Sequence, residues 1–338
     1  MGNANLGKAK IAKEAEFYTY YDDIKKELVN YAKYFKGKVI YCNCDDHNGI
    51  GLGTPKSNFI KYLADNFEAF QIKKVIATHY EKDKDHSTMY ILDKDNTGDG
   101  IICFEDIAEI PMKGNGDFRS PECVELLKQA DIVITNPPFP LLREYVAQLI
   151  EYKKSFLIIG TDNCRTYKEI LPLVKDNKFW CGLNHVKQFF RPNGSVQNFG
   201  NVSWYTNLDN RNRREILHTG KKYYGYENMY PKYDNYDAIE VSKIADLPMD
   251  YEGIMGVPIT FLDKYNPEQF ELLGCADYTG KYGSDELGIK PIGKTWMTKY
   301  RAQGGRGHYT ANMTSLVYYD NKGDAKPTFK RILIKRRK

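Results

Sequence analysis

Asp131-Ile132-Val133-Ile134-Thr135-Asn136-Pro137-Pro138-Phe139 is the most informative segment of the chain. Its apolar part predicts a short buried strand, and the periodicity of residues 141–152 predicts an amphipathic helix soon after it. Each proline fixes its φ angle near about −65°, so the two prolines stiffen the connection between strand and helix. Because ligands of an open parallel sheet bind at the carboxyl ends of its strands, Asn136 and Phe139 stand where a ligand is expected.

Strands and helices alternate on both sides of this segment. The other strands are predicted at residues 38–44, 73–78, 155–160 and 201–206, with two more runs within 89–104, and the other helices at 20–35 and 58–67. This alternation is typical of an α/β fold with a mostly parallel sheet. Beyond about residue 220 the alternation stops, and the chain becomes rich in Tyr, Gly and Lys. We therefore predict a larger domain over residues 1–220 and a smaller, irregular domain over residues 221–338.

Composition excludes several classes of protein. Of the 338 residues, 42% are hydrophobic and 28% are charged, which is typical of a folded globular chain. No apolar run approaches the roughly 20 residues that span a bilayer, and the N-terminal residues lack the apolar core of a signal peptide, so no membrane partner is expected. The seven cysteines contain no Cys-x-x-Cys pair, and the six histidines show no metal-ligand or Ser/His/Asp spacing. We therefore expect a cytoplasmic protein that binds no metal.

The Asn-Pro-Pro-Phe sequence fits one kind of chemistry. The exocyclic amine of a ring base is a poor nucleophile because its lone pair is delocalised into the ring. Two rigid acceptors, the Asn136 side-chain oxygen and the Pro137 carbonyl, can each accept one N–H bond and draw the nitrogen toward a reactive, tetrahedral shape. Pro138 keeps the loop stiff, and Phe139 would stack on the base, which must leave a duplex to be reached. By itself, the tetrapeptide is equally compatible with a stiff turn that has no function.

Longer segments around this motif resemble those of the N6-adenine DNA methyltransferases, and in detail those of the EcoRI-type modification methylases. The matching segments follow the family's order along nearly the whole chain: residues 16–19, 41–46, 57–59, 135–139, 198–202, 204–208 and 255–260. Several motifs in register are far more specific than Asn-Pro-Pro-Phe alone. The resemblance implies a Rossmann-like, seven-stranded methyltransferase sheet that binds S-adenosylmethionine beside the target base, and a separate target-recognition domain.

The resemblance also implies residues for the cofactor. Phe17, Tyr18 and Thr19 are expected to line its methionine end, and Asp45 and Asp46 are expected to lie near its amino group. The Gly-rich loop that the family has directly after the first strand is not seen in its usual form, because the glycines of residues 49–53 follow only later.

Further residues follow from the same resemblance. Asp117 is expected to accept a hydrogen bond from the adenine amine of the cofactor, with Phe118 packed nearby. Glu81 is the candidate that holds the ribose hydroxyls. Phe199 matches the second ring that flanks the flipped base, although simple packing in the core is an equal alternative for it.

Basic residues indicate where DNA would bind. Two groups are candidates for this contact: Arg211, Arg213 and Arg214 in the middle of the chain, and Lys294, Lys299, Arg301 and Arg306 among aromatic residues near its end. Basic side chains neutralise phosphates, and arginines can also read bases. For any one of these residues, an ordinary polar loop is an equal alternative.

Together these features predict transfer of a methyl group from S-adenosylmethionine to N6 of a flipped adenine in double-stranded DNA, with no covalent enzyme intermediate. We expect a monomer that serves as the modification component of a restriction–modification system. A cognate restriction endonuclease would be encoded nearby but not stably bound, and GAATTC is a candidate site. Alternatives with the same chemistry are methylation of RNA or of protein glutamine, and a further alternative is a catalytically silent DNA-binding module. N4-cytosine methylation is disfavoured, since those enzymes usually have Ser where this chain has Asn136.

Overall fold

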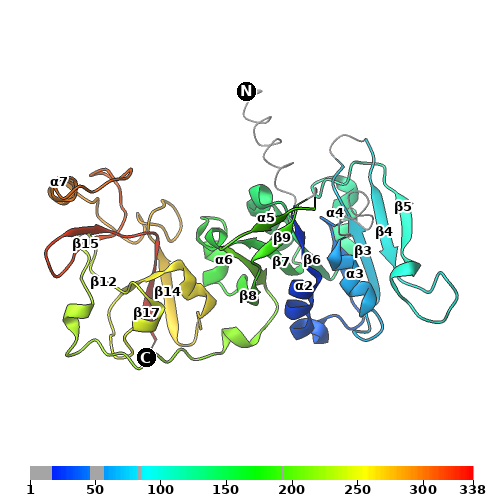
Figure 1. Cartoon of the computed structure of the whole chain (residues 1–338), viewed down its shortest axis with the longest axis horizontal. Helices are drawn as coiled ribbons and strands as arrows, with labels where there is room; N and C mark the ends of the chain where they lie inside the picture. The colour runs from blue at the N-terminus through cyan, green and yellow to red at the C-terminus, as the bar shows by residue number, and fades with distance from the viewer. Residues whose placement is uncertain (1–16, 46–56, 82–84, 192–193, 338) are drawn as a thin grey trace. The chain divides into compact units, whose positions relative to one another are not determined.

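The computed structural model describes residues 17–45, 57–81, 85–191 and 194–337 (Figure 1). The chain divides into two compact units. The first unit consists of Met1–Cys164 and Trp180–Asn210, and the second consists of Arg165–Phe179 and Arg211–Lys338. The segment Arg165–Phe179 therefore belongs with the C-terminal part of the chain, although it precedes residue 220 by a wide margin.

The first unit is built on an eight-stranded mixed sheet. In spatial order its strands are β5 (Ala108–Pro111), β4 (Thr88–Leu92), β3 (Lys74–Thr78), β2 (Val39–Cys42), β6 (Ile132–Thr135), β7 (Ser155–Thr161), β11 (Val202–Thr206) and β8 (Trp180–His185). The central strands β3, β2, β6 and β7 pair in parallel, whereas every pairing outside them is antiparallel. The expectation of a mostly parallel sheet thus holds for the centre and is wrong for the edges, where strands are added without a crossover helix. This sheet has eight strands among the described residues, whereas the resemblance implies a sheet of seven.

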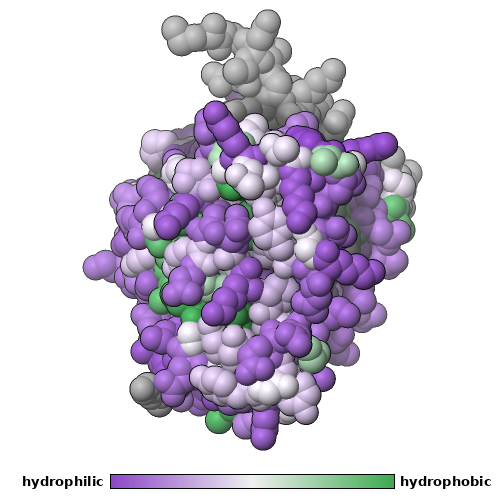
Figure 2. Space-filling model, turned by 90° about the vertical axis from the view of Figure 1, so that its left-hand side faces the viewer, coloured by the Kyte–Doolittle hydropathy of each residue, from purple (hydrophilic) through white to green (hydrophobic). Residues whose placement is uncertain are grey.

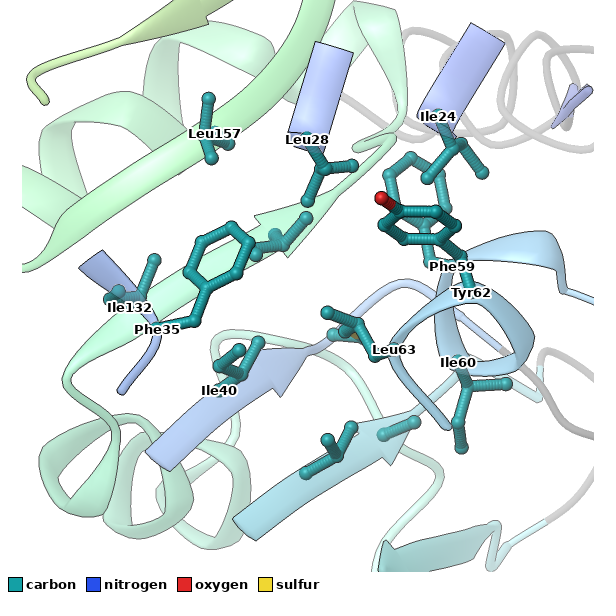
Figure 3. Packing of buried hydrophobic residues seen from close by; sticks show 14 of the residues in the cluster. Ile24, Leu28, Phe35, Ile40, Phe59, Ile60, Tyr62, Leu63, Ile132 and Leu157 are labelled. Atoms are coloured by element: carbon teal, nitrogen blue, oxygen red, sulfur yellow. The ribbon is translucent and has the colours of Figure 1, made fainter. Parts of the chain in front are cut away.

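Helices cover both faces of this sheet. On one face, α2 (Tyr21–Leu28) and α3 (Asn58–Asp65) pack their apolar side chains against the strands, and Figure 3 shows Ile24 and Leu63 in the same cluster as Ile40 of β2. The neighbouring Tyr41 points to the other face, where it contacts Cys123 of α4 (Pro121–Gln129). Helix α5 (Leu142–Glu151) packs on β7. Because successive residues of a strand face opposite sides, burial on both faces requires apolar residues at every position.

The second unit contains a sheet of its own, so the expectation that this part is irregular is wrong. Its strands lie in the order β12 (Ile239–Glu240), β13 (Met255–Pro258), β17 (Arg331–Arg336) and β14 (Phe270–Cys275), and β15 (Val317–Tyr319) pairs with β16 (Ala325–Pro327). Helix α6 (Leu171–Lys175) lies against β14, and α7 (Lys294–Ala302) packs on β16. β17 pairs with both β13 and β14, and this joins residues far apart in sequence. The local sequence pattern therefore did not predict this sheet.

The remaining elements are a small three-stranded sheet, described below with the site, and short 3-10 turns. The turns are η1 (Val29–Tyr34), η2 (Phe104–Asp106), η3 (Phe139–Leu141), η4 (Asp162–Thr166), η5 (Arg211–Arg213), η6 (Glu227–Met229), η7 (Ile244–Asp246) and η8 (Ile259–Asp263). Among the described residues, no helix is both long enough and apolar enough to cross a membrane. All seven cysteines are free thiols.

Asp106 organises the long connection between β4 and β5. Its buried carboxylate accepts hydrogen bonds from the backbone N–H groups of Cys103 (2.9 Å), Asn96 and Thr97 (2.8 Å each). These bonds hold the chain in a folded loop where the sequence predicted a strand, and the second strand of the hairpin begins only at Ala108.

Acid is expected to weaken this loop. The hydrogen bond from the Cys103 backbone, together with those from Thr97 and Asn96, outweighs burial and holds the pKa of Asp106 well below its ordinary value. The contribution of Asp106 to stability is therefore present above its unfolded pKa of about 3.9. It is lost as the pH falls from that value through the lower pKa of the folded state. The free energy of unfolding in urea should fall more steeply with acid in the wild type than in Asp106→Asn. Equal slopes in the two proteins would contradict this assignment.

Candidate active site

Asn136 follows β6 directly and has a fixed orientation. Its Nδ2 donates a hydrogen bond to the backbone carbonyl of Phe17 at 2.6 Å. Since a carbonyl can only accept, this bond determines which end of the amide is nitrogen and which is oxygen. The Asn136 Oδ1 is buried, and no group in the described part of the chain donates to it. A buried acceptor without a donor is uncommon in folded proteins and indicates a place for a ligand.

The segment that carries Phe17 is held in place by two sets of contacts. β1 (Tyr18–Thr19) pairs with β9 (Gln188–Phe190), which also pairs with β10 (Val196–Asn198). Asn58 of α3 also donates to the Thr19 carbonyl at 2.7 Å. The Thr19 side-chain hydroxyl is buried and has no hydrogen-bond partner among residues that the structure describes. The two asparagines, Asn136 and Asn58, thus bind alternate carbonyls of one short segment.

Four phenylalanine rings gather beside Asn136. The predicted base-stacking residues Phe139 and Phe199 lie 6.1 Å apart between ring centroids, with their planes at 83°. Phe17 lies 4.8 Å from Phe199 and 6.0 Å from Phe139, and Phe189 lies 5.5 Å from Phe199. The structure therefore brings together three predicted residues and adds Phe189, which the sequence analysis missed. The double aromatic Phe189-Phe190 in an otherwise polar stretch was the available signal.

Asp45 joins the ends of three central strands. It is buried, and it accepts hydrogen bonds from Ser57 Oγ at 2.7 Å and from Thr135 Oγ1 at 2.9 Å. Its backbone N–H donates to the Thr78 carbonyl at 2.9 Å. The carboxylate thus lies at the carboxyl ends of β2, β3 and β6, where a ligand of this sheet is expected. The neighbouring Asp46 and the glycines of residues 49–53 lie outside the described residues.

Asn43 is a second oriented amide at the end of β2. The hydroxyl of the buried Tyr145 donates to its Oδ1, and burial raises the pKa of Tyr145 well above its ordinary value, so the hydroxyl stays protonated. The Asn43 Nδ2 is buried and meets no acceptor within the described ranges. Tyr145 also packs edge-on against Phe118 with ring centroids 5.1 Å apart. Neither Asn43 nor Tyr145 was singled out from the sequence for a role at the site.

Glu81 lies beyond β3 and contacts His79. The Glu81 Oε1 and the His79 Nε2 are 3.0 Å apart, and the Glu81 backbone N–H donates to the Asn115 carbonyl at 2.8 Å. Gly116 allows this close approach: its φ is +79°, and a Cβ there would lie 1.9 Å from the His79 carbonyl oxygen. The structure thus brings the predicted Glu81 close to the segment that carries Asp117.

Asp117 is engaged by Arg119. Its carboxylate accepts from the Arg119 side chain at 2.7 Å and 3.0 Å and from the Arg119 backbone N–H at 2.9 Å. Burial raises the pKa of Asp117, but the hydrogen bonds and positive charge of Arg119 outweigh it and hold the pKa below its ordinary value. Asp117 is therefore an anion at neutral pH, fit to accept an N–H bond. Arg119 also contacts Glu144 at 3.1 Å.

The comparisons with known proteins identify the family. A family model described as adenine-specific methyltransferase EcoRI matches residues 5–195 and 185–337. The chain belongs to the EcoRI family of adenine-specific methyltransferases. No solved structure matches it.

Known relatives of this EcoRI-family methyltransferase resemble it over most of their length. It is 46% identical to the type II methyltransferase M.EcoRI of Escherichia coli over 320 residues, which cover 86% of this chain and 94% of that protein. It is 39% identical to the type II methyltransferase M.MgeORF184P of Mycoplasma genitalium over 290 residues, 80% of this chain and 86% of that protein. It is 38% identical to the type II methyltransferase M.MpnI of Mycoplasma pneumoniae over 289 residues, 80% and 85% of the two chains.

All seven predicted DNA-binding residues of this EcoRI-family methyltransferase fall in the second unit. Arg211 and Arg213 belong to η5, and Arg214 follows it. On α7, the Lys299 ammonium lies 5.0 Å from the centre of the Tyr319 ring, while Lys294 opens the helix. A cleft of about 600 Å³ also lies in this unit, lined by Met249, Asp250, Tyr251, Glu252, Glu271, Lys335, Arg336 and Arg337, and it contains none of the predicted site residues.

Metal ligands do not gather in the described part of this EcoRI-family methyltransferase. No group of three or more His, Cys, Asp or Glu residues there could hold a metal ion.

Proposed function

We propose that this EcoRI-family methyltransferase methylates N6 of adenine in double-stranded DNA, with S-adenosylmethionine as the methyl donor. The observation that carries the proposal is the orientation of Asn136, whose bond to the Phe17 carbonyl leaves a buried oxygen that accepts no hydrogen bond from the described residues. An exocyclic amine supplies the N–H donor that such an oxygen lacks.

The residues around Asn136 would act on the amine by position. The Asn136 Oδ1 and the Pro137 carbonyl each accept one N–H, which draws the amine out of conjugation with the ring. Phe139 and Phe199 would flank the base that has left the duplex. Since these rings now contact one another and Phe17, entry of a base requires them to move apart. The Asn136 Oδ1 is itself buried, which limits competition from water for this hydrogen bond.

The polar groups at the ends of the central strands fit S-adenosylmethionine. When bound, this cofactor supplies an electrophilic methyl group on a sulfonium, and it offers amino, carboxylate and hydroxyl groups for recognition. Asn43 Nδ2 is a buried donor and Thr19 Oγ1 a buried hydroxyl, neither with a partner in the described ranges. Phe17, Tyr18 and Asp45 would complete the methionine end, together with Asp46. Glu81, Asp117 and Phe118 would bind the adenosine part.

The fold supports the same assignment. Parallel strands β3, β2, β6 and β7 direct Asp45 and Asn136 to one edge of the sheet, as in a Rossmann-like domain that binds its ligand at the carboxyl ends of the strands. We therefore assign catalysis to the first unit and target recognition to the second. Arg211, Arg213, Arg214, Lys294, Lys299 and Arg306 would contact the DNA.

The relatives named above are type II methyltransferases, and on that basis we assign this chain to the modification side of a restriction–modification system. A monomer in the cytoplasm suffices for this role, and its endonuclease would act on the same site without forming a stable complex.

Nucleoside analysis tests the proposed function. Duplex DNA is incubated with the protein and radiolabelled S-adenosylmethionine, digested to nucleosides, and separated by chromatography. Label in N6-methyl-2′-deoxyadenosine is the expected result. Label in N4-methyl-2′-deoxycytidine, label only in parallel incubations with RNA or protein in place of DNA, or no label at all, would overturn the proposal.

Asp117→Ala is expected to raise the dissociation constant of S-adenosylmethionine by roughly 10-fold or more, because a hydrogen bond to a charged group is worth about 1.5–3 kcal/mol. Titration calorimetry in the absence of DNA measures this directly. Glu144→Ala is the matched control, since it removes the other carboxylate bound to Arg119. A change of equal size in both variants would assign the effect to Arg119 instead of the cofactor.

A further inference from the structure

The loop of residues 304–309, which follows α7 in the second unit, has its backbone oxygens bound by the helix. Arg301 donates through Nη1 to the Gly305 carbonyl at 2.9 Å. Through Nη2 it donates to the carbonyls of Gly307 at 3.0 Å and Tyr309 at 3.2 Å. The Arg301 guanidinium is thus directed at the protein's own backbone, although the sequence grouped it with residues that contact DNA.

Tyr300 anchors the same loop to the core. Its ring stacks on the buried Trp296, with centroids 4.9 Å apart and planes at 18°. Its hydroxyl donates to the Arg306 carbonyl at 2.6 Å. Gly305 lies so close that a Cβ there would be 2.5 Å from the Tyr300 carbonyl oxygen, so only glycine fits. The conformation of the loop is therefore set by the helix beneath it.

The loop displays basic side chains on this support. Arg306 and His308 are exposed, whereas the backbone between them is held from within. Residues 287–319 contain no aspartate or glutamate, so no carboxylate of this segment opposes an anionic partner. Figure 2 views the molecule from the side on which Figure 1 draws α7, and hydrophilic side chains cover most of that face. Such a surface suits a polyanion better than an apolar protein partner.

We propose that loop 304–309 reads base edges of duplex DNA through Arg306, and that Arg301 is a positioning residue that holds the loop. The inference rests on the proposed function and adds a specificity-determining element to it. An arginine on a rigid support can bond in a bidentate manner to O6 and N7 of guanine in the major groove. A mobile loop would not hold the Arg306 guanidinium in register with one base pair, and its ordering on binding would also cost affinity.

The test begins with the recognised site, found by sequencing methylated adenines in DNA from cells that express the full chain. Binding to a duplex with this site is compared by fluorescence anisotropy with binding to duplexes that each carry one altered base pair. For Arg306→Ala and Arg306→Lys, discrimination at one guanine-containing pair should fall roughly 10-fold or more. Lysine retains the charge but not the planar fork, so it should not rescue. Lys243→Ala, at an exposed basic position of the same unit, is the matched control and should leave discrimination unchanged.

Arg301→Lys separates positioning from contact. If Arg301 holds the loop, discrimination falls at the same base pair as for Arg306, while the salt dependence of binding stays unchanged. A contact of Arg301 with phosphate would instead reduce the salt slope and weaken binding to every duplex alike. That second result would overturn its role as a positioning residue. A merely structural loss would lower the thermal midpoint and affect all duplexes equally, which also contradicts the proposal.

Methylation by the chain and base reading by loop 304–309 are tested by separate results. Absence of methylated adenine in DNA from cells with the wild-type chain would overturn the proposed function. A defined methylated site, with unchanged discrimination in both Arg306 variants, would leave that function intact and overturn the role of loop 304–309. Because Arg306 lies at an exposed tip, its variants remain informative even if Arg301→Lys does not fold.

Discussion

Asn136→Ala is expected to lower the rate of methyl transfer by roughly 10²–10³-fold, the usual effect of removing one preorganised hydrogen-bonding group from an active site. The variant loses the acceptor for the amine and also the donor that binds the Phe17 carbonyl. Single-turnover measurement of tritium transfer to duplex DNA would report the chemical step directly. Asn136→Asp should also be impaired, because an oxygen would then face the Phe17 carbonyl oxygen.

Asn30→Ala is a suitable control for this experiment. Asn30 is exposed, and its amide donates only to backbone carbonyls of α2 at 2.8 Å and 3.0 Å. Its replacement should leave the transfer rate unchanged. Full activity in Asn136→Ala would remove the central role assigned to this amide, whatever the state of the cofactor site.

Glu240→Ala is expected to destabilise the second unit by about 3–5 kcal/mol, because it leaves the mostly buried Arg331, whose side chain is 12% exposed, without its counter-ion. Glu240 is 2% exposed, and its carboxylate accepts three hydrogen bonds from Arg331 at 2.7, 2.9 and 3.2 Å. Tyr233 and Ser242 donate to the same carboxylate. Urea unfolding followed by circular dichroism measures the loss.

Asp324→Ala provides the comparison within the same unit. Asp324 contacts Lys326 at 3.6 Å, and its side chain is 48% exposed. Exposed ion pairs contribute only about 0–1 kcal/mol, so this variant should unfold close to the wild type. Similar losses of unfolding free energy in the two variants would contradict the prediction that burial makes the Glu240–Arg331 pair more important for stability than the exposed Asp324–Lys326 pair.

The centre of the first unit could be predicted because its strands are buried on both faces. β2, β3, β6 and β7 read as continuous apolar runs, and each lies within two residues of its predicted bounds. Helix α4, which was not predicted, begins with a typical start signal, a serine N-cap followed by proline. Ser120 precedes Pro121, and the Ser120 Oγ accepts a hydrogen bond from the Cys123 N–H at 3.2 Å. Strands β4 and β11 were also predicted, within 89–104 and at 201–206. Their antiparallel pairing, the outer strands β5 and β8 and the sheet of the second unit were not predicted, since these pairings depend on partners distant in sequence.

The residues of the candidate site could be named from the sequence, but their contacts could not. The chemistry of Asn136 and Phe139 followed from their residue types, and Phe17 and Phe199 from the family resemblance. The hydrogen bond that orients Asn136 joins residues 119 positions apart, so no local sequence pattern predicts it. The orientation of Asn43 could not be predicted for the same reason, because it is set by a hydrogen bond from Tyr145, 102 positions away.

Because Arg165–Phe179 belongs to the second unit, the gene encodes that unit in two separated pieces. A single crossover near codon 211 between two relatives would combine the C-terminal piece of one parent with the shorter piece of the other. The mismatch would fall on partly buried contacts such as the ion pair of Arg165 with Asp263 and the hydrogen bond from Lys175 to the Leu273 carbonyl. Chimaeric enzymes should therefore keep the second unit stably folded only when both pieces come from the same parent.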